Sequence, residues 1–315
     1  YQVTIEQIIC DAHPGYDSHR WALQQAIPLT KVLHHHAHAS ALYGEQSGAA
    51  DWLVFSWDGT GMGSDQTLWG GESFIGRPGA WQRFSSMRPF NLPGGEKAGR
   101  EPWRSALALL WESKTDIDEP LLKKWGKTSD EIALLHSAWR QGLNSPQSSA
   151  AGRLFDAAAA LIGIPAQSSY EGQAPAQLEA LVNNESEMDI TPIPLPISED
   201  SNGIQRSDWE VLLPILQNRN LTPVERATIF HHTMAENIVT LAKLARDQHH
   251  IKDVGLTGGV FQNRRLTELS VSKLEASGFT VHLAGVVPSN DGGLCYGQII
   301  EAAAQSGDNH QHESN

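Results

Sequence analysis

The segment Thr30-Lys31-Val32-Leu33-His34-His35-His36-Ala37-His38-Ala39 joins a short apolar strand to a helix that begins with a cluster of histidines. Residues four apart in a helix lie on one face about one turn apart, so His34 and His38 can bind the same metal ion. Two imidazoles do not complete a first-row metal site, and oxygen ligands must come from elsewhere, with Asp58 and Asp291 as candidates. The competing interpretation is a solvated histidine-rich helix end, because this spacing is common.

The residues around this segment predict a parallel α/β sheet. Residues 7–10 are a short buried strand that ends at a Pro-Gly turn, Ser18 can cap a helix that runs to Gln25, and residues 30–33 form a second strand. A strand, helix, strand order is typical of parallel sheets. The histidines then lie past the carboxyl end of the second strand, where open α/β sheets bind their ligands, and a helix over 35–44 follows.

A second glycine-containing motif follows the apolar strand at 52–57. The sequence continues as Asp58-Gly59-Thr60-Gly61-Met62-Gly63 and resumes as a strand at 67–75, which predicts a hairpin with a glycine-rich bend. Glycines let backbone N–H groups surround an anion, and an aspartate at the strand end can hold a cation beside it. A tight turn alone would also require glycine. A third strand is expected near 81–87.

The middle of the chain, from Pro93 to about Arg246, is predicted to be mainly helical. One helix begins near Ser148 and stops at Gly163. Its small residues at 150–152 permit a close approach to the backbone, and tight helix packing is the simpler explanation. Residues 168–173 form a loop, and residues 183–207, rich in Pro, Asp, Glu and Asn, are expected to be a surface excursion.

The last part of the chain repeats the order of strand, glycine turn and helix. A long helix over 224–246 precedes a strand at 254–257 and the turn Gly258-Gly259-Val260-Phe261-Gln262-Asn263. A helix, a strand at 280–283 and the motif at 288–293 follow, with a final helix through Ala304. Glycine turns of this kind bind phosphate or ribose when they lie at the carboxyl edge of a sheet.

Composition narrows the classes of function. The chain has 315 residues, is 40% hydrophobic and carries a formal charge of −13, which argues against a general binder of nucleic-acid backbone. It has no apolar run long enough to cross a bilayer and no signal-peptide pattern at its start, so we expect a cytoplasmic protein without a membrane partner. The 2 cysteines, Cys10 and Cys295, are too few for a thiolate metal site.

Six motifs in this order resemble the C-terminal Kae1-like domain of the hydrogenase-maturation carbamoyltransferase HypF. They are HHHAH at 34–38, DGTGMG at 58–63, AGRLFDAAAAL at 151–161, SYEGQA at 169–174, GGVFQN at 258–263 and NDGG at 290–293. The resemblance implies a two-lobed α/β fold of the actin-like, Hsp70-like and sugar-kinase-like (ASKHA) type, with nucleotide in the cleft.

The resemblance also assigns site residues. It implies that His34, His38, Asp58 and Asp291 bind a divalent metal, iron or zinc, and take part in catalysis. It implies that a second set contacts the nucleotide, ATP or carbamoyl adenylate: Asp156, Gly172, Gly258, Gly259 and Asn263. His35 and His36 are candidates for supporting hydrogen bonds or substrate contact. Cys295 is either a nucleophile or, as a compact apolar group, a buried helix residue.

The sequence departs from complete HypF chains because it lacks the acylphosphatase-like domain, the Cys-rich zinc motifs and the YrdC-like domain. We therefore expect a partial N-terminal lobe at 1–50 without its opening strands, a C-terminal lobe at 51–305 with a helical insertion at about 94–250, and a disordered tail at 306–315.

The implied activity is transfer of a carbamoyl group from carbamoyl adenylate to the C-terminal cysteine thiolate of a HypE-type partner, for cyanide ligand synthesis. Alternatives are an O-carbamoyltransferase that acts on a small-molecule hydroxyl and a non-catalytic nucleotide-binding or interaction fragment. The related tRNA-modifying branch is disfavoured by the motif context and by the acidic charge. A metallopeptidase is excluded because the glutamate of HExxH is missing.

Overall fold

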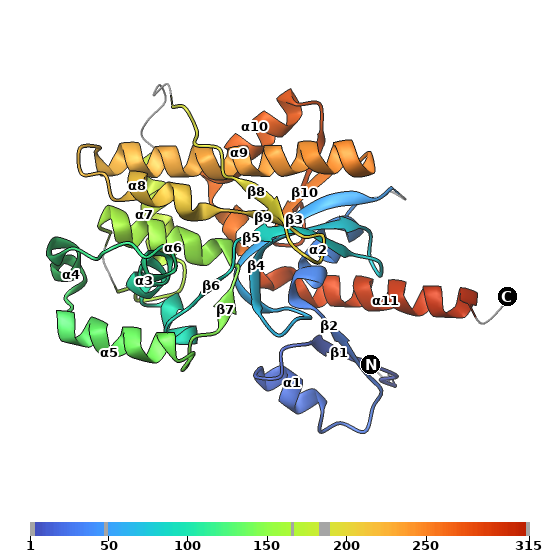
Figure 1. The fold of residues 1–315 in the computed structure, drawn as a ribbon. Helices are drawn as coiled ribbons and strands as arrows, with labels where there is room; N and C mark the ends of the chain where they lie inside the picture. The colour runs from blue at the N-terminus through green and yellow to red at the C-terminus, as the bar shows by residue number, and fades with distance from the viewer. Residues whose placement is uncertain (1–3, 47–49, 165–166, 183–189, 313–315) are drawn as a thin grey trace.

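A mixed sheet of nine strands forms the centre of the protein in a computed structural model, which describes residues 4–46, 50–164, 167–182 and 190–312 (Figure 1). Its main order is β11-β10-β3-β4-β5-β9-β8, with β6 and β7 joined at β4. The strands are β3 (Trp52–Met62), β4 (Leu68–Gly76), β5 (Gln82–Met87), β6 (Phe90–Asn91), β7 (Gln147–Ser148), β8 (Ile197–Glu199), β9 (Gln205–Ser207), β10 (Asp253–Thr257) and β11 (Thr280–Leu283). β3 runs parallel to β10 and antiparallel to β4.

Helices cover both faces of this sheet (Figure 1). The α-helices are α1 (Asp17–Ala22), α2 (His34–Gly44), α3 (Pro102–Glu112), α4 (Glu119–Trp125), α5 (Ser129–Arg140), α6 (Ala151–Ile162), α7 (Gln173–Val182), α8 (Leu213–Leu216), α9 (Pro223–His249), α10 (Arg264–Ala276) and α11 (Leu294–His312). Four 3₁₀ turns lie between them: η1 (Gly95–Gly99), η2 (Trp209–Leu212), η3 (Gly259–Gln262) and η4 (Asp291–Gly293).

Strand β3 separates two hydrophobic cores because successive side chains point to opposite faces of a sheet. Leu53, Phe55 and Trp57 pack into the large core under α3, α6 and α9. Val54 packs on the other face with Leu42 of α2. Each such buried side chain contributes roughly 1.5–3 kcal/mol relative to an exposed one. The polar carboxyl end of β3 therefore has a fixed position between the two helical layers.

The first residues form a separate two-stranded parallel sheet, β1 (Ile8–Asp11) with β2 (Leu29–Val32). This agrees with the predicted strand, helix, strand order, although α1 begins after Tyr16 without a side-chain cap and ends at Ala22 rather than Gln25. From this small sheet the chain enters α2, which crosses α11 at very short range. A Cβ atom on Gly297 would lie 1.8 Å from the carbonyl oxygen of Ala37, so only glycine fits there.

The predicted glycine-rich bend is wrong in position. β3 continues through Asp58 to Met62, with a shift of register between Trp57 and Gly61, and the chain reverses later, where the N–H of Gly63 donates to the carbonyl of Thr67 (2.9 Å). Gly61 allows close packing of the strand on the histidine helix. A Cβ on Gly61 would lie 2.6 Å from Cε1 of His35.

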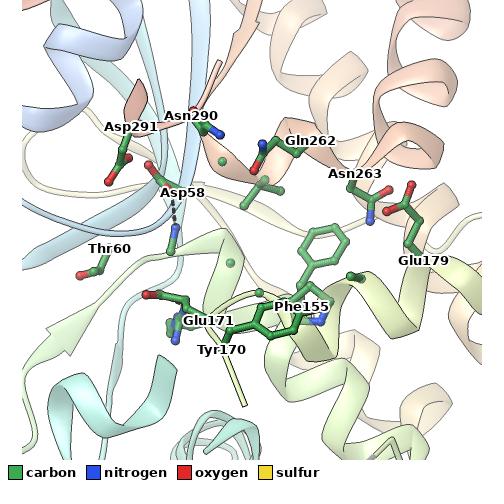
Figure 2. A pocket seen from close by; sticks show the side chains of 18 of the residues that line it. Asp58, Thr60, Phe155, Tyr170, Glu171, Glu179, Gln262, Asn263, Asn290 and Asp291 are labelled. Atoms are coloured by element: carbon green, nitrogen blue, oxygen red, sulfur yellow. Dashed lines mark hydrogen bonds and ion pairs between the residues drawn. The ribbon is translucent and has the colours of Figure 1, made fainter. Parts of the chain in front are cut away.

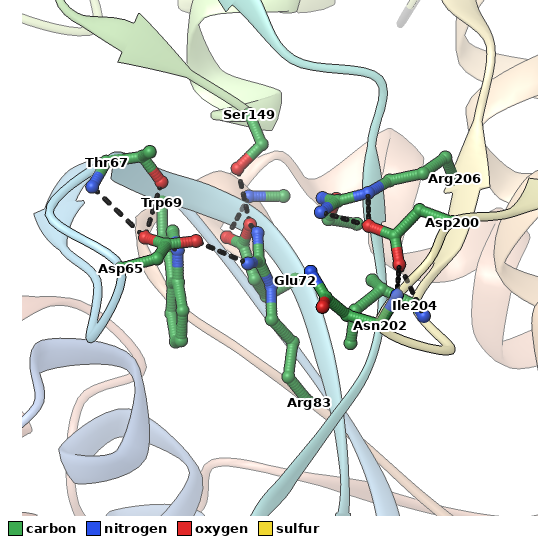
Figure 3. A network of polar contacts seen from close by, with 12 residues as sticks. Asp65, Thr67, Trp69, Glu72, Arg83, Ser149, Asp200, Asn202, Ile204 and Arg206 are labelled. Carbon is green, nitrogen blue, oxygen red and sulfur yellow. Dashed lines mark hydrogen bonds and ion pairs between the residues drawn. The ribbon is translucent and has the colours of Figure 1, made fainter.

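The excursion predicted over 183–207 is also partly wrong. Residues 183–189 lie outside the described part of the chain, but β8 and β9 form a hairpin that extends the main sheet, with β9 parallel to β5. An ion pair between Arg206 and Asp200 holds the hairpin together (2.7 Å; Figure 3). The prediction failed because these strands are too short and polar to show an alternating apolar pattern.

A buried carboxylate fixes the start of α6 against β4 (Figure 3). Glu72 is 0% exposed, accepts a hydrogen bond from the N–H of Gly71 (2.8 Å) and pairs with Arg83 (2.8 Å). The hydroxyl of Ser149, just before α6, also donates to Glu72. The predicted close approach at 150–152 is tight packing, since a Cβ on Gly152 would lie 2.8 Å from the carbonyl oxygen of Asp58.

The end predicted for α6 is confirmed, whereas the end predicted for the final helix is wrong. α6 ends at Gly163 with φ 104°, which confirms the glycine stop. The final helix, in contrast, does not end at Ala304 but continues to His312, so the tail predicted to be disordered is helical over 306–312. Its polar residues include no proline, and polarity alone does not stop a helix. Residues 313–315 lie outside the described part. Within the described residues, no helix is both long and apolar enough to span a bilayer.

Candidate metal and nucleotide site

The structure brings the four predicted metal ligands together. His34 and His38 project from the first turns of α2, Asp58 lies in β3, and Asp291 opens η4 before α11. Nε2 of His38 lies 2.9 Å from Oδ2 of Asp58 and 3.5 Å from Oδ1 of Asp291, and the corresponding distances from Nε2 of His34 are 3.4 and 3.6 Å. One donor atom from each residue lies within 4.8 Å of all the others.

The donor atoms fit a first-row divalent ion. Two imidazole nitrogens with two carboxylate oxygens are a set that iron and zinc both accept, and this set does not distinguish between them. A buried carboxylate fixes one imidazole for this role: Oδ2 of Asp11 accepts a hydrogen bond from Nδ1 of His34 (2.9 Å). The Nε2 atom of His34 is thereby directed at Asp58 and Asp291, as in carboxylate–histidine–metal arrangements.

The charges of these residues are strongly coupled. Burial by itself lowers the pKa of His34, but its hydrogen bonds to Asp11, Asp291 and Asp58 outweigh burial and hold that pKa well above its usual value. Burial raises the pKa of Asp58, and the bonds from His34 and His38 more than reverse this and hold it well below. The hydrogen bonds from the same imidazoles lower the pKa of Asp291. Both carboxylates are therefore ionised at neutral pH and can accept a cation.

A cavity of about 610 Å³ opens beside the four residues. In Figure 2, Asp58 and Asp291 lie at one end and Asn263 and Glu179 at the other. The cavity is lined by Tyr16, Asp58, Gly59, Thr60, Gly152, Arg153, Phe155, Tyr170, Glu171, Gly172, Pro175, Ala176, Glu179, Gly259, Val260, Gln262, Asn263, Asn290, Asp291 and Gly292. Its size suits a drug-sized ligand or mononucleotide.

Of the five predicted nucleotide contacts, three line this cavity: Gly172, Gly259 and Asn263. Asp156 and Gly258 do not line it. Asp156 is 1% exposed, on the buried side of α6, and burial raises the pKa of its carboxyl group to about 7 although Arg153 opposes the shift. Gly258 is required by packing instead, because a Cβ there would lie 2.2 Å from the carbonyl oxygen of Trp57.

His231, which sequence reasoning did not select, orients Asn263. Nδ1 of His231 donates to the carbonyl of Ala227 (2.8 Å), so its Nε2 accepts from the side-chain amide of Asn263 (3.0 Å). Burial lowers the pKa of His231 to about 4, which keeps this imidazole neutral. The amide oxygen of Asn263 caps α10 by accepting the N–H of Leu266 (2.9 Å). Both ends of the amide are thereby fixed.

The remaining candidates do not reach the cavity. His35 is fully buried, and neither of its ring nitrogens has a hydrogen-bond partner among the described residues. Nδ1 of His36 lies 3.8 Å from Oε1 of Glu301 on α11. Cys295 is on α11 as expected but is exposed, which corrects the prediction of a buried residue.

The loop before Asp291 is attached to the end of α2. Glu45 accepts hydrogen bonds from the backbone N–H groups of Gly285 (2.8 Å), Val286 (2.6 Å) and Val287 (2.7 Å). The slight burial of Glu45 opposes these bonds, yet they lower the pKa of its carboxyl group. One helix therefore provides two histidines at its start and anchors the loop of Asp291 at its end.

Comparisons with known proteins identify the family. Residues 54–298 match the family model "Carbamoyltransferase, Kae1-like Domain, second subdomain", and residues 1–45 match "HypF Kae1-like domain". The chain is 34% identical to the carbamoyltransferase HypF of Synechocystis, over 95% of this chain and 40% of that protein. It is 33% identical to a carbamoyltransferase HypF homolog of Cupriavidus necator, over 96% of this chain and 78% of that protein.

Two solved structures share the fold. A full-length HypF in its phosphate- and nucleotide-bound form superposes with a TM-score of 0.86 at 30% identity, over 96% of this chain and 39% of that one. The T. kodakarensis HypF superposes with a TM-score of 0.84 at 24% identity, over 97% of this chain and 41% of that one. The chain thus spans about 40% of the first of these relatives.

The fold and the site define a Kae1-like protein of the ASKHA class, as the sequence predicted. Within that class, the chain belongs to the HypF carbamoyltransferase family and corresponds to its Kae1-like domain.

Proposed function

We propose that this chain transfers a carbamoyl group from carbamoyl adenylate to a thiolate acceptor and releases AMP. One observation carries the proposal: two imidazoles and two carboxylates converge at one end of a cavity whose other end offers the side chain of Asn263. A carbamoyl adenylate has a reactive carbonyl beside a phosphate at one end and adenosine at the other, and it fits this division.

The transfer needs positioning and charge stabilisation more than a strong acid, because AMP is a good leaving group. The acceptor sulfur attacks the carbamoyl carbon, the bond from that carbon to the phosphate oxygen breaks, and AMP leaves with the electron pair. His34, His38, Asp58 and Asp291 would hold a divalent ion, which supplies Lewis-acid polarisation of oxygens when bound. Asn263 would orient the nucleoside through the amide that His231 fixes.

The acceptor that family membership favours is the C-terminal cysteine thiolate of a HypE-type protein, in the synthesis of the cyanide ligand of hydrogenases. The carbamoyl adenylate would come from a YrdC-like domain, with an acylphosphatase-like domain upstream, as in full-length family members. An O-carbamoyltransferase would use the same cavity with a hydroxyl acceptor, so only the acceptor distinguishes these functions.

The test is single-turnover transfer from preformed carbamoyl adenylate. A peptide that ends in cysteine, the same peptide ending in serine, and a small polyol are compared by mass spectrometry of the product. We expect carbamoylation of the cysteine peptide alone, with loss in Asp58→Asn. Transfer to the polyol but not to the cysteine peptide would establish the alternative acceptor.

A parallel binding measurement addresses the non-catalytic alternative. His38→Ala should lose bound iron or zinc, because His38 provides one of the four donor atoms. Elemental analysis measures the metal content. If His38→Ala keeps stoichiometric metal, the metal site as described is wrong. If the unmodified chain binds metal and AMP but transfers nothing to any acceptor, the chain is a binding module in isolation.

A further inference from the structure

The charges that line the cavity are unevenly distributed. Four carboxylates face it, those of Asp58, Glu171, Glu179 and Asp291, whereas Arg153 is the single cationic side chain among the described residues that line it. A ligand with a phosphate group is repelled by carboxylates and attracted by a guanidinium group. The position of Arg153 therefore decides where an anionic ligand group can be bound by the protein itself.

The guanidinium group of Arg153 lies between two carboxyl groups, one buried and one exposed to solvent. Its Nη1 atom lies 3.1 Å from Oδ2 of Asp156, which is buried beneath it. Its Nη2 atom donates to Oε1 of Glu171 (2.9 Å). The two partners differ greatly in environment, since the side chain of Asp156 is 1% exposed and that of Glu171 is 62% exposed. Asp156 is thus a buried neighbour whose Oδ2 forms no hydrogen bond among the described residues, and Glu171 is the hydrogen-bonded partner, attached through one oxygen.

Two glycines from different segments leave room around this ion pair. A Cβ on Gly59 of β3 would lie 3.0 Å from both Nη2 of Arg153 and Oε1 of Glu171. A Cβ on Gly99 of η1 would lie 3.2 Å from Nη1 of Arg153. The absence of side chains at these positions leaves room beside the guanidinium for a phosphate or carboxylate group, two oxygens of which arginine can bind at once.

A further donor on Arg153 has no partner. Its Nε–H is buried, and no hydrogen-bond acceptor reaches it among the described residues. An arginine that is 5% exposed normally has its donors paired, because an unpaired buried donor is costly. The side chain therefore has capacity for an additional acceptor that the protein does not provide.

We propose that Arg153 is the phosphate-binding residue of this cavity, and that the Glu171 carboxylate is a displaceable occupant that gives way to the phosphate of the ligand. This rests on the proposed function, since it takes the ligand to be an adenine nucleotide. The Oε1 atom of Glu171 occupies the position that one phosphate oxygen would take beside Nη2 of Arg153. Rotation of the mostly exposed Glu171 side chain is enough to release it.

Displacement makes the site selective for nucleotides over nucleosides. The phosphate of AMP can form the ion pair with Arg153 that Glu171 releases. Adenosine has no phosphate to replace the carboxylate, and it leaves the Arg153–Glu171 pair in place. Glu171 also keeps Arg153 neutralised in the free protein, so other small anions must compete with it. Arg153 and Glu171 would thus act as specificity-determining residues.

The test compares AMP with adenosine by isothermal titration calorimetry at matched metal content, in the unmodified chain, Arg153→Gln and Glu171→Gln. We expect AMP to bind more tightly than adenosine. Arg153→Gln should weaken AMP binding by about tenfold or more and leave adenosine binding unchanged. Glu171→Gln should strengthen AMP binding about two- to fivefold, because the competing charge is removed.

Glu268→Gln is the matched control. It removes the carboxylate of a solvent-exposed arginine pair, Arg264–Glu268 on α10, which does not line the cavity, and it should change neither affinity. If Arg153→Gln does not fold, the AMP affinity of Glu171→Gln alone tests the proposal. Equal binding of AMP and adenosine by the unmodified chain, or weaker AMP binding in Glu171→Gln, overturns the role of this pair while the proposed function stands. Failure to bind either compound overturns the proposed function as well.

Discussion

Asp11 lies 2.9 Å from Nδ1 of His34, and both side chains are almost completely buried. The aspartate ends β1, in the small sheet, while the histidine begins α2. Asp11 also accepts the backbone N–H of His13 through its other oxygen (2.7 Å), which fixes the orientation of the carboxylate. The first strand of the chain thus determines the direction of a predicted metal ligand.

We predict that Asp11→Ala weakens metal binding by about 10- to 100-fold, because His34 loses the partner that orients its ring. The measurement is competition with a chelator, followed by elemental analysis. Asp17→Ala is the control, since Asp17 is a nearby carboxylate with a side chain that is 94% exposed. Unchanged metal affinity in Asp11→Ala would show that the hydrogen bond has no role in binding.

Glu45→Ala should loosen the loop that carries Asp291. The carboxylate accepts three backbone N–H groups from 285–287, and their loss costs about 1 kcal/mol each at most because the site is open to water. We expect faster hydrogen exchange at 285–287 and weaker metal binding, with little change in global unfolding. Glu275→Ala, on the exposed surface of α10, is the control. Faster exchange without any loss of metal affinity would limit Glu45 to a local structural role.

His231→Phe should reduce AMP affinity about fivefold, because the amide of Asn263 loses its acceptor and becomes free to rotate. Calorimetry with AMP measures the effect, and thermal unfolding separates it from loss of stability. His232→Phe, on the more exposed side of α9, is the control. If only the melting temperature falls and AMP affinity stays unchanged, Asn263 serves α10 alone.

The buried carboxyl group of Asp156 should make the stability of the folded protein depend on pH. Burial, opposed by Arg153, raises the pKa of Asp156 from 3.8 to about 7, so the folded state holds a proton that the unfolded state releases. The stability from this group is complete below about pH 4 and is lost as the pH rises to about 7, with an upper limit on the order of 4 kcal/mol.

The measurement is the free energy of unfolding from denaturant titrations across this pH range, in the unmodified chain and in Asp156→Asn. The unmodified chain should lose stability relative to Asp156→Asn as the pH rises from about 4 to about 7. A constant difference between the two proteins over that range would mean that the carboxyl group titrates normally.

The sequence predicted most long elements because their apolar residues follow regular periods. The strand around Phe55 and the long helix α9 are examples, and the spacing of His34 and His38 identified the start of the metal site. The resemblance of motifs added Asp58 and Asp291. Local patterns could not reveal Asp11, which resembles an ordinary turn residue before Pro14, or Glu45, whose partners lie at 285–287.

The sequence also could not show which side chains of a helix face the cavity. Asp156 and Arg153 lie on the same helix three residues apart, yet Arg153 lines the cavity while Asp156 is buried beneath it. The direction of each side chain depends on how α6 packs on β3, and that depends on contacts such as Gly152 with the Asp58 carbonyl. Tertiary packing of this kind has no signature in a short stretch of sequence.

The crossing of α2 and α11 at Gly297 and Ala37 has a consequence for the order of assembly. Asp291 lies far along the chain from the other three candidate metal ligands, and contacts of high sequence separation cost more loop-closure entropy. An ion can therefore be held tightly only after α11 has docked on α2. Retained metal would then distinguish chains that have completed their folding from those that have formed the sheet alone.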